Sequence, residues 1–560
     1  MNTNKHISTP NQNIKPSPKL GIQGTVIGWL DPWAGAASDK FMRTGTGAIL
    51  PAQDPPPSPQ QFLSLLQELK AEFYVHQLFP GLEGQKQLLE DIEQSGMDLC
   101  LGNEYGNING PWTVGTNRYD VPDEHVLEAA ATGRLIGLLY DEPEHLQINA
   151  AQYRKDGWFP HWGNTDAKTV EQQRSQVTDA VSRQVQHVQH LLKTSTLELG
   201  TVPLVAEHVF PMMLHAHARG GMALCPKIMK ESFQSLQLAT ALGAAKQYKR
   251  PLWICADLWG PDVGGWPIRT PGFPGHSPEE FASALRLGYY MAPERLFAEN
   301  IDALAVFSEQ GFRTTAFGEV WQQFVGEFVP QHPLTWSHSD ASPDIAIIYA
   351  DDSNYGQNER PFGNRSLVMP DASQSLFQIW HLISHGTIPQ HGSCMHIPGY
   401  DFPRHELKRL IPDTDFPLFH GVKLPHNPPM HSLFYPANNV LVFDGFVREQ
   451  ELGRPQLIFI AGSSVSANTL LTARTSAEQG AVVIAATWLL PKEWRTSRRF
   501  ANGGLWLPVE TFLSDEVRSA AAAHVGTSDC WLQRFGETEV RIHRGDNGGF
   551  TLDFEIHNLG

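Results

Sequence analysis

From residue 21 onward the chain repeats one pattern, in which a short apolar run rich in branched residues is followed by an amphipathic stretch. This alternation predicts βα units around a parallel sheet, because strands that are buried on both faces contain nearly continuous apolar residues. We count eight such units over about 310 residues, which is the size of one (β/α)8 TIM barrel. The barrel is placed at residues 21–335, with strands at 24–29, 72–77, 97–102, 135–140, 203–206, 222–225, 252–256 and 303–307.

The stretches between the predicted strands carry the three- and four-residue spacing of helices. The clearest one covers residues 169–193, where Val177, Val181 and Val185 form part of a single apolar stripe. Another begins at Ser277 with the sequence SPEE, which is a helix N-cap followed by a proline and two acids. We therefore expect an outer layer of helices around the eight strands.

A second α/β pattern begins after a Pro-, His- and Ser-rich stretch. Apolar runs at 344–350, 439–443, 456–461 and 481–486 predict an open α/β sheet, and we assign residues 340–515 to this domain. The tail at 516–560 alternates polar and apolar residues, which predicts a small C-terminal β region. Residues 1–20 are polar and rich in Pro and Asn, and we expect them to be a disordered lead-in.

Composition limits the partners of the protein. The 560-residue chain has 42 Lys and Arg against 59 Asp and Glu, and the net charge of −17 argues against nucleic acid and anionic membranes as partners. The five cysteines show no C-x-x-C spacing, so we expect free thiols, with no disulfide framework and no zinc cluster. No run reaches the ~18 apolar residues of a membrane span. We expect a soluble protein without a cofactor, and the sequence leaves open whether it is cytoplasmic or secreted.

The residues that follow the predicted strands define the candidate site. The βα loops of a (β/α)8 barrel open on one face, so reactive side chains gather at the C-terminal ends of the strands. Six of the eight predicted strands have a carboxylate within two residues of their ends, and crowded like charges destabilise a fold unless they are paired or protonated. In chain order, the candidates are Trp29, Asp31, Trp33, Asn103, Glu104, Asp141, Glu142, Glu207, His208, Lys227, Asp257, Trp259, Trp266 and Glu309.

Paired carboxylates beside indole rings are the groups that cleave glycosidic bonds. One carboxyl group protonates the leaving oxygen, while the other stays ionised to attack the anomeric carbon or to activate water. Strands three apart face each other obliquely across the barrel mouth, which pairs Glu142 with Asp257 and Glu207 with Glu309. We take Glu142 as the general acid, because it directly follows an apolar strand and Pro143 fixes the exit of the loop. Each of these acids could instead cap a helix or pair with an arginine.

We expect the other candidates to bind the substrate. The rings of Trp29, Trp33, Trp259 and Trp266 suit the apolar faces of sugars, and ordinary burial is the alternative for each indole. The polar side chains are expected to contact sugar hydroxyl groups or to brace the acids, and these are Asp31, Asn103, Glu104, Asp141, His208 and Lys227. The predicted function is a glycoside hydrolase that acts on an oligo- or polysaccharide.

This layout resembles the clan-A (β/α)8 glycoside hydrolases, and specifically the family 42 β-galactosidases, in which a domain similar to class I glutamine amidotransferases follows the barrel. Three features carry the resemblance: Asp141-Glu142-Pro143, which is similar to the Asn-Glu-Pro acid motif, Asp257 after strand seven, and the run DIAIIYADDSNYG that opens the second domain. The resemblance implies two-carboxylate hydrolysis. The chain departs from the family pattern in having Asp141 in place of Asn and Asp257 in place of Glu.

The second domain resembles an amidotransferase without its nucleophile. The turn that matches the position of the family's cysteine reads Ala461-Gly462-Ser463-Ser464 and offers no thiol. We therefore expect a structural domain, through which the protein could form a homo-oligomer.

Two other functions stay open. The sequence His215-Ala216-His217 resembles the metal-binding H-x-H of amidohydrolase-type barrels, which would make the protein a metal-dependent hydrolase. In that family the motif belongs to the first strand, whereas here it follows the fifth. A barrel without catalytic activity could also serve as a carbohydrate-binding protein.

Overall fold

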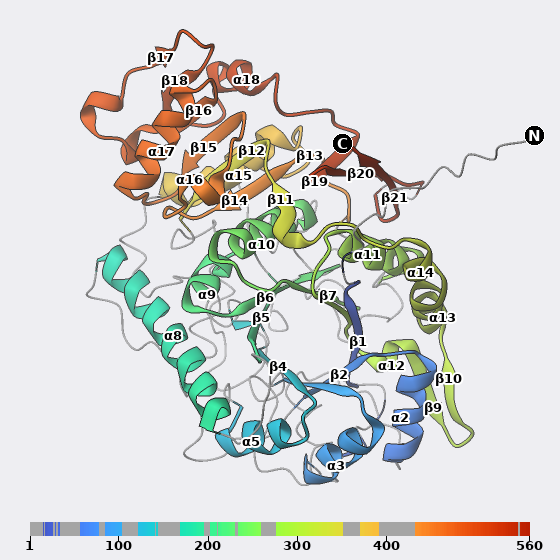
Figure 1. Cartoon of the computed structure of the whole chain (residues 1–560). Helices are drawn as coiled ribbons and strands as arrows, with labels where there is room; N and C mark the ends of the chain where they lie inside the picture. The colour runs from blue at the N-terminus through green and yellow to red at the C-terminus, as the bar shows by residue number, and fades with distance from the viewer. Residues whose placement is uncertain are drawn as a thin grey trace, which may run out of the picture.

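The computed structural model describes residues 15, 17–25, 29, 32–33, 56–77, 85–102, 121–140, 142–143, 169–194, 202–209, 211–229, 233–258, 276–350, 370–390, 432–546 and 549–559. Figure 1 shows a ring of parallel strands surrounded by helices, a second α/β layer against one side of the ring, and the C-terminal strands beside that layer. Within the described ranges, no helix has both the length and the hydrophobicity that a membrane span requires.

A closed barrel forms the first part of the chain. Its eight strands pair in chain order, all of them parallel, and the first strand also pairs with the eighth. The strands are β1 (Lys19–Gln23), β2 (Phe73–Gln77), β3 (Asp98–Gly102), β4 (Leu135–Tyr140), β5 (Leu204–His208), β6 (Ala223–Ile228), β7 (Trp253–Ala256) and β8 (Arg295–Ala298). The predicted TIM barrel is therefore confirmed.

Helices cover the outside of the barrel. They are α2 (Pro59–Glu68), α3 (Gln85–Ser95), α5 (Asp123–Ala131), α8 (Val170–Thr194), α9 (Leu214–Gly220), α10 (Gln234–Tyr248) and α11 (Pro278–Tyr290). The helix predicted at 169–193 is α8, and Val181 and Val188 on its apolar stripe are buried. Helix α11 begins as its N-cap sequence predicts, because the hydroxyl of Ser277 accepts a hydrogen bond from the N–H of Glu280.

Two of the predicted strand positions are wrong. The first barrel strand is β1, which begins at Lys19 inside the segment that we expected to be a lead-in. The eighth is β8, a four-residue strand that pairs with both β7 and β1. The run predicted as strand eight instead forms α12 (Ile301–Leu304) and β9 (Ala305–Ser308), and β9 pairs antiparallel with β10 (Gly311–Thr314) in a separate two-stranded sheet. The apolar signal of the true strand, RLFA, is shorter than that of the run ALAVF that follows it.

Aromatic rings fill the interior of the barrel near the N-terminal ends of the strands, where glycines leave room for them. A Cβ atom on Gly21 would lie 2.4 Å from the ring of Phe73, and one on Gly137 would lie 2.7 Å from the ring of Trp253. Phe73 and Trp253 are the first residues of their strands, and their ring centroids are 5.9 Å apart. The N-terminal half of the barrel is thus closed by packed apolar side chains, so any site in the barrel lies at the C-terminal ends of the strands.

A six-stranded sheet with the order β14-β12-β15-β16-β18-β17 follows the barrel. Its strands are β12 (Ile345–Tyr349), β14 (Val440–Phe443), β15 (Leu457–Ala461), β16 (Val482–Ala486), β17 (Arg498–Arg499) and β18 (Leu505–Val509). Its helices are α15 (Pro370–Ile383), α16 (Glu449–Leu452), α17 (Ala467–Glu478) and α18 (Asp515–Ala521). All pairs are parallel except that of β17 with β18. The predicted open α/β sheet is confirmed, and it includes β18, which the sequence analysis missed.

The C-terminal strands form a small antiparallel sheet. Strands β19 (Cys530–Phe535), β20 (Thr538–Arg544) and β21 (Leu552–Asn558) pair in sequence. Two short strands also pair with β19, namely β11 (Ala341–Ser342), which is antiparallel to it, and β13 (Ala437–Asn438), which is parallel to it. Helices α13 (Ala316–Gln323) and α14 (Val329–Gln331), joined by a π-helical segment, lead from the barrel toward this sheet. The ring centroids of Phe554 in β21 and Tyr290 in α11 are 5.3 Å apart. The C-terminal sheet therefore packs against the barrel as well as extending the second domain.

Helix α10 of the barrel packs directly on strand β14 of the second sheet. A Cβ atom on Gly243 would lie only 1.8 Å from the carbonyl oxygen of Val442, so the two backbones touch at this glycine. The Nε2 atom of His215 lies 3.0 Å from the same carbonyl oxygen. These contacts fix the second sheet against the helical face of the barrel.

Asp444, two residues beyond this contact, anchors a polar network between the two parts of the chain. Its carboxylate is fully buried and accepts hydrogen bonds from Gln247 and Tyr248 at 2.5 Å each. Arg219 lies 3.1 Å away and forms a salt bridge with it. Burial by itself would raise the pKa of Asp444, but the Arg219 guanidinium and the hydrogen bonds hold this pKa below its ordinary value.

Candidate active site

Four acidic side chains converge on one buried lysine at the C-terminal end of the barrel. The Nζ atom of Lys227 lies 2.9 Å from Oε2 of Glu299 and 3.1 Å from Oε1 of Glu142. The same atom lies 3.6 Å from Oε2 of Glu207 and 3.6 Å from Oδ2 of Asp257. The Glu142 side chain is 8% exposed, and none of the other four exceeds 1%. We call these five residues the rim cluster.

The alternation of side chains along the strands brings the rim cluster together. Glu207 and Lys227 lie within β5 and β6, whereas Asp257 and Glu299 directly follow β7 and β8. Every second residue of a barrel strand points inward, which places all four side chains in the interior. The backbone ladder continues one residue beyond β7 and β8, because the N–H groups of Asp257 and Glu299 donate to carbonyl oxygens of neighbouring strands at 3.0 Å. Main-chain hydrogen bonds thus hold the backbone of Asp257 and of Glu299 in place.

Glu142 follows β4 in a strained backbone conformation. Its φ of +42° lies in the left-handed region, which residues other than glycine rarely adopt, and a following proline such as Pro143 favours extended backbone instead. Strain of this kind persists where the surrounding structure imposes it, and it is concentrated at functional sites. The hydrogen bond from Lys227 holds the carboxyl group in the rim cluster.

The rim cluster contains more negative than positive groups. Four carboxyl groups surround one ammonium. A buried charge without a compensating charge destabilises a fold by an amount on the order of several kcal/mol. The negative charge of the cluster also affects the pKa of two neighbouring thiols. Burial, and after it the carboxylate of Glu207, raise the pKa of Cys225 and of Cys255 well above the ordinary value. Both thiols therefore stay protonated at neutral pH.

One trio of side chains in the described part of the chain has donor atoms close enough to surround an ion. These are Glu207, Cys255 and Glu299, whose donor atoms all lie within 4.8 Å of one another. The Lys227 ammonium lies 2.9 Å from Glu299 and 3.6 Å from Glu207, so it already supplies a positive charge to two of these three groups. The donor set does not favour a metal. Cys255 is one of four free thiols in the described residues, with Cys100, Cys225 and Cys530.

The two histidines of the H-x-H sequence lie on helix α9, away from the barrel interior. His217 is fully buried, and its Nδ1 atom lies 3.0 Å from Nε2 of His208. Burial lowers the pKa of His217 to about 3, and burial together with His217 lowers the pKa of His208 well below its ordinary value. The substrate-binding prediction for His208 is corrected, because His208 follows Glu207 in β5 and so points away from the barrel interior. Nor does this placement support a metal-binding role for the motif.

The structure also corrects the prediction that Trp29 and Trp33 bind substrate. They are 1% and 2% exposed. The indole N–H of Trp29 donates to the carbonyl oxygen of Ala305, and that of Trp33 donates to Asp91. Both rings pack edge-on against Phe62 of helix α2, with centroids 5.6 and 5.3 Å apart. The two rings are core residues, because β1 already ends at Gln23 and both rings pack against Phe62 of α2.

Glu309 does not belong to the rim cluster. It is exposed, in the turn between β9 and β10, because the eighth barrel strand lies earlier in the chain than we predicted. The strand-eight position is held by Glu299, which the sequence analysis missed. The signal was present in the sequence RLFAEN, where an acid directly follows a short apolar run.

The rim cluster contains four of the predicted site residues, namely Glu142, Glu207, Lys227 and Asp257. The remaining six predicted residues lie outside the described residues, and they are Asp31, Asn103, Glu104, Asp141, Trp259 and Trp266.

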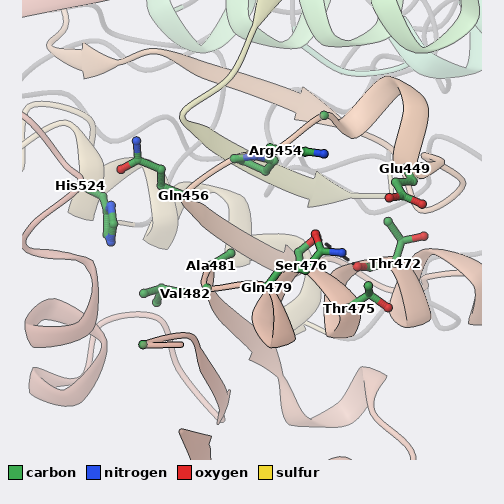
Figure 2. A pocket seen from close by; sticks show the side chains of 14 residues that line it. Glu449, Arg454, Gln456, Thr472, Thr475, Ser476, Gln479, Ala481, Val482 and His524 are labelled. Carbon is green, nitrogen blue, oxygen red and sulfur yellow. Dashed lines mark hydrogen bonds between the residues drawn. The ribbon is translucent and has the colours of Figure 1, made fainter. Parts of the chain in front are cut away.

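A separate pocket of about 660 Å³ lies at the N-terminal edge of the second sheet, before strands β15 and β16. Figure 2 shows Arg454 and Gln456 on one side of this pocket and the side chains of Thr472, Thr475 and Ser476 on the other. Its lining includes a single acid. A pocket of this composition has no pair of carboxylates, so it is not a second candidate for the chemistry of the rim cluster.

Comparison with known proteins supports the fold. No family model and no curated protein matches the sequence. The structure is similar to that of a β-galactosidase from the psychrophilic Marinomonas ef1, with a TM-score of 0.53 and 10% identity, over 97% of this chain and 100% of that one. This chain shares its fold from the barrel to the C-terminal sheet. The likeness confirms the fold that the resemblance to clan-A glycoside hydrolases implied.

Two further solved structures are similar at lower scores. A β-galactosidase from the Antarctic haloarchaeon Halorubrum lacusprofundi has a TM-score of 0.48 and 9% identity, over 96% of this chain and 99% of that one. An exo-β-1,4-mannosidase from Opitutaceae bacterium strain TAV5 has a TM-score of 0.44 and 12% identity, over 98% of this chain and 87% of that one.

Proposed function

We propose that this protein is a glycoside hydrolase that cleaves an oligo- or polysaccharide with two carboxyl groups. The observation that carries the proposal is the approach of Glu142 and Asp257 to the same lysine at the C-terminal end of the barrel. They follow strands β4 and β7, which are the positions that the resemblance implies for the proton donor and its partner. Carboxyl groups that converge from several strands on this face are typical of barrel active sites.

The spacing of the two acids supports this proposal. Their oxygens lie 3.1 and 3.6 Å from the same nitrogen, so they are separated by no more than the sum of these two distances. Retaining glycosidases hold their carboxyl groups about 5 to 5.5 Å apart, and inverting ones about 6.5 to 9.5 Å apart. This upper bound applies to one oxygen of each acid, and it is compatible with the close spacing of retaining enzymes, so the proposed reaction is written with retention.

In the proposed reaction, Glu142 gives its proton to the glycosidic oxygen while Asp257 attacks the anomeric carbon. The bond to the leaving sugar breaks as the bond to Asp257 forms. Water then attacks the same carbon, gives its proton to Glu142 and releases Asp257. The excess of carboxyl groups in the rim cluster supports the first step. Ionised carboxylates repel one another in a buried site, and this repulsion favours a cluster in which one carboxyl group keeps its proton.

The first substrates to test are β-galactosides. The fold is shared with a protein described as a β-galactosidase, and this likeness is the reason to begin with that class. The test is a panel of nitrophenyl glycosides and unmodified disaccharides, with products separated and identified. Glu142→Gln is expected to lower turnover of disaccharides by roughly 10²- to 10⁴-fold. It should impair nitrophenyl glycosides less, because nitrophenolate leaves without a proton.

The matched variants distinguish the two roles. Asp257→Asn should impair both kinds of substrate, because the attack on the anomeric carbon is required for each. Glu309→Gln is the control, since Glu309 is exposed outside the barrel, and it should leave turnover unchanged. Full hydrolysis by both the Glu142 and Asp257 variants would refute the proposal. Glycan binding without turnover in the wild-type protein would indicate a carbohydrate-binding protein, and loss of turnover on chelation would indicate a metal-dependent hydrolase.

A further inference from the structure

We infer that Lys227 is a positioning residue that sets the pH range over which the acids of the rim cluster can work. This inference rests on the proposed glycosidase function, and it gives Lys227 a different role from the substrate contact that the sequence suggested. The lysine acts through the carboxyl groups around it and contacts no sugar.

Burial and contacts explain why Lys227 is not a substrate-binding group. Its side chain is 1% exposed, and its Nζ atom lies within 3.6 Å of all four acids. An ammonium has three N–H donors, and four carboxyl groups already compete for them. The shortest contact is with Glu299, whose side chain is fully closed to solvent. The lysine is therefore engaged on every side by the cluster.

The charge balance around Lys227 comes from strands β4 to β8. The titratable groups that face it in the described residues are the four acids and the thiols Cys225 and Cys255, and these thiols stay protonated. Arg295 lies at the opposite end of β8, with its guanidinium 4.8 Å from the ring of Trp253. Lys227 is thus a cation in contact with all four acids.

If Lys227 acts through its charge, removing that charge and removing a neighbouring negative charge should shift the pH dependence of activity in opposite directions. Removal of the positive charge at Lys227 makes ionisation of every neighbouring acid harder, so activity should move to higher pH. Removal of one negative charge, at Glu299, makes ionisation of the remaining acids easier, so activity should move to lower pH. Removal of both should leave the balance nearly unchanged. A lysine that served only to fill space would not give shifts of opposite sign.

The test compares Lys227→Met, Glu299→Gln and the double variant with the wild-type protein. The measurement is the pH profile of kcat/KM on an unmodified disaccharide that the wild type cleaves. We expect Lys227→Met to shift the profile upward by about one pH unit or more and Glu299→Gln to shift it downward. The double variant should return to within about half a unit of the wild type. Shifts in the same direction, or a loss of rate with an unmoved profile, would overturn the inference.

A second readout keeps this inference separate from the proposed function. Infrared titration of protonated carboxyl groups follows the same four proteins without any substrate. Loss of the carboxyl band should occur at higher pH in Lys227→Met and at lower pH in Glu299→Gln. If the wild type cleaves no glycoside but these shifts are present, the proposed function fails and the inference on Lys227 stands. If the band titrates identically in all four proteins, the inference fails whatever the enzyme cleaves. Should Lys227→Met not fold, Lys227→Gln also removes the charge and replaces it in the titration, and a carboxyl band that titrates as in the wild type would overturn the inference.

Discussion

The ammonium of Lys227 lies 2.9 Å from the carboxylate of Glu299, and both side chains are closed to solvent. Replacing Lys227 by Met removes the ammonium that contacts four buried carboxyl groups. We expect the free energy of unfolding to fall by roughly 3 to 5 kcal/mol near pH 8, where ionised carboxyl groups have lost this contact. The loss should be smaller near pH 5, where the acids can take up protons. Urea unfolding at both pH values measures it.

The control for this prediction is Lys86→Met on helix α3. Lys86 is exposed, and we expect its replacement to change stability by less than about 0.5 kcal/mol. An equal loss for Lys227→Met at the two pH values would contradict the ionic explanation.

Asp444 joins the barrel to the second sheet through Arg219, Gln247 and Tyr248. Asp444→Asn leaves the Arg219 guanidinium without its carboxylate in a buried site, and the free energy of unfolding should fall by about 3 kcal/mol at pH 7. The folded protein holds the pKa of Asp444 below its ordinary value of 3.8. Its contribution is therefore complete above pH 3.8 and is lost as the pH falls below that value.

Denaturant unfolding of Asp444→Asn and wild type from pH 7 to pH 3 tests this prediction. The two curves should stay apart down to about pH 4 and approach each other only below it. Asp553→Asn on the exposed edge strand β21 is the matched control and should follow the wild type. Curves that converge near pH 6 would point to a different titrating group.

Gly243 allows helix α10 to touch the backbone of strand β14. Gly243→Ala would place a Cβ atom 1.8 Å from the carbonyl oxygen of Val442, so the helix or the strand must move. We expect a loss of about 3 kcal/mol in the free energy of unfolding. Gly326→Ala is the control, because the nearest atom there is the mobile end of Lys70 at 3.3 Å. If both variants unfold at the same denaturant concentration as the wild type, α10 and β14 are not in direct contact.

His217 makes the fold sensitive to acid. Burial lowers the pKa of His217 from 6.5 to about 3, so the unfolded chain binds a proton below pH 6.5 that the folded chain does not bind until about pH 3. Stability is therefore lost as the pH falls through this window. His217→Gln should reduce the slope of the free energy of unfolding against pH by up to about 1.4 kcal/mol per unit between pH 6 and pH 4. An unchanged slope, measured by urea unfolding at several pH values, would exclude His217 as the source.

Local pattern was sufficient to predict much of this protein. The run 135–140 became β4 with the bounds that were predicted, and the 25-residue helix α8 and the N-cap at Ser277 follow from spacing and residue type alone. These features depend on residues within a few positions of one another. Glu142 could be identified as a candidate acid for the same reason, since it stands beside an unmistakable strand.

The membership of the rim cluster depended on pairing between distant strands. The sequence offered Glu309, but β8 is a four-residue strand that gains its stability from β7 on one side and from β1, at the far end of the barrel segment, on the other. No local window contains that information, so Glu299 was overlooked. For the same reason, we predicted that Trp29 and Trp33 lie at the C-terminal end of the first strand, whereas β1 ends at Gln23. The sequence determined which side chains are available for chemistry, and barrel closure decided which of them meet, because strand register is fixed by contacts between residues far apart in the chain.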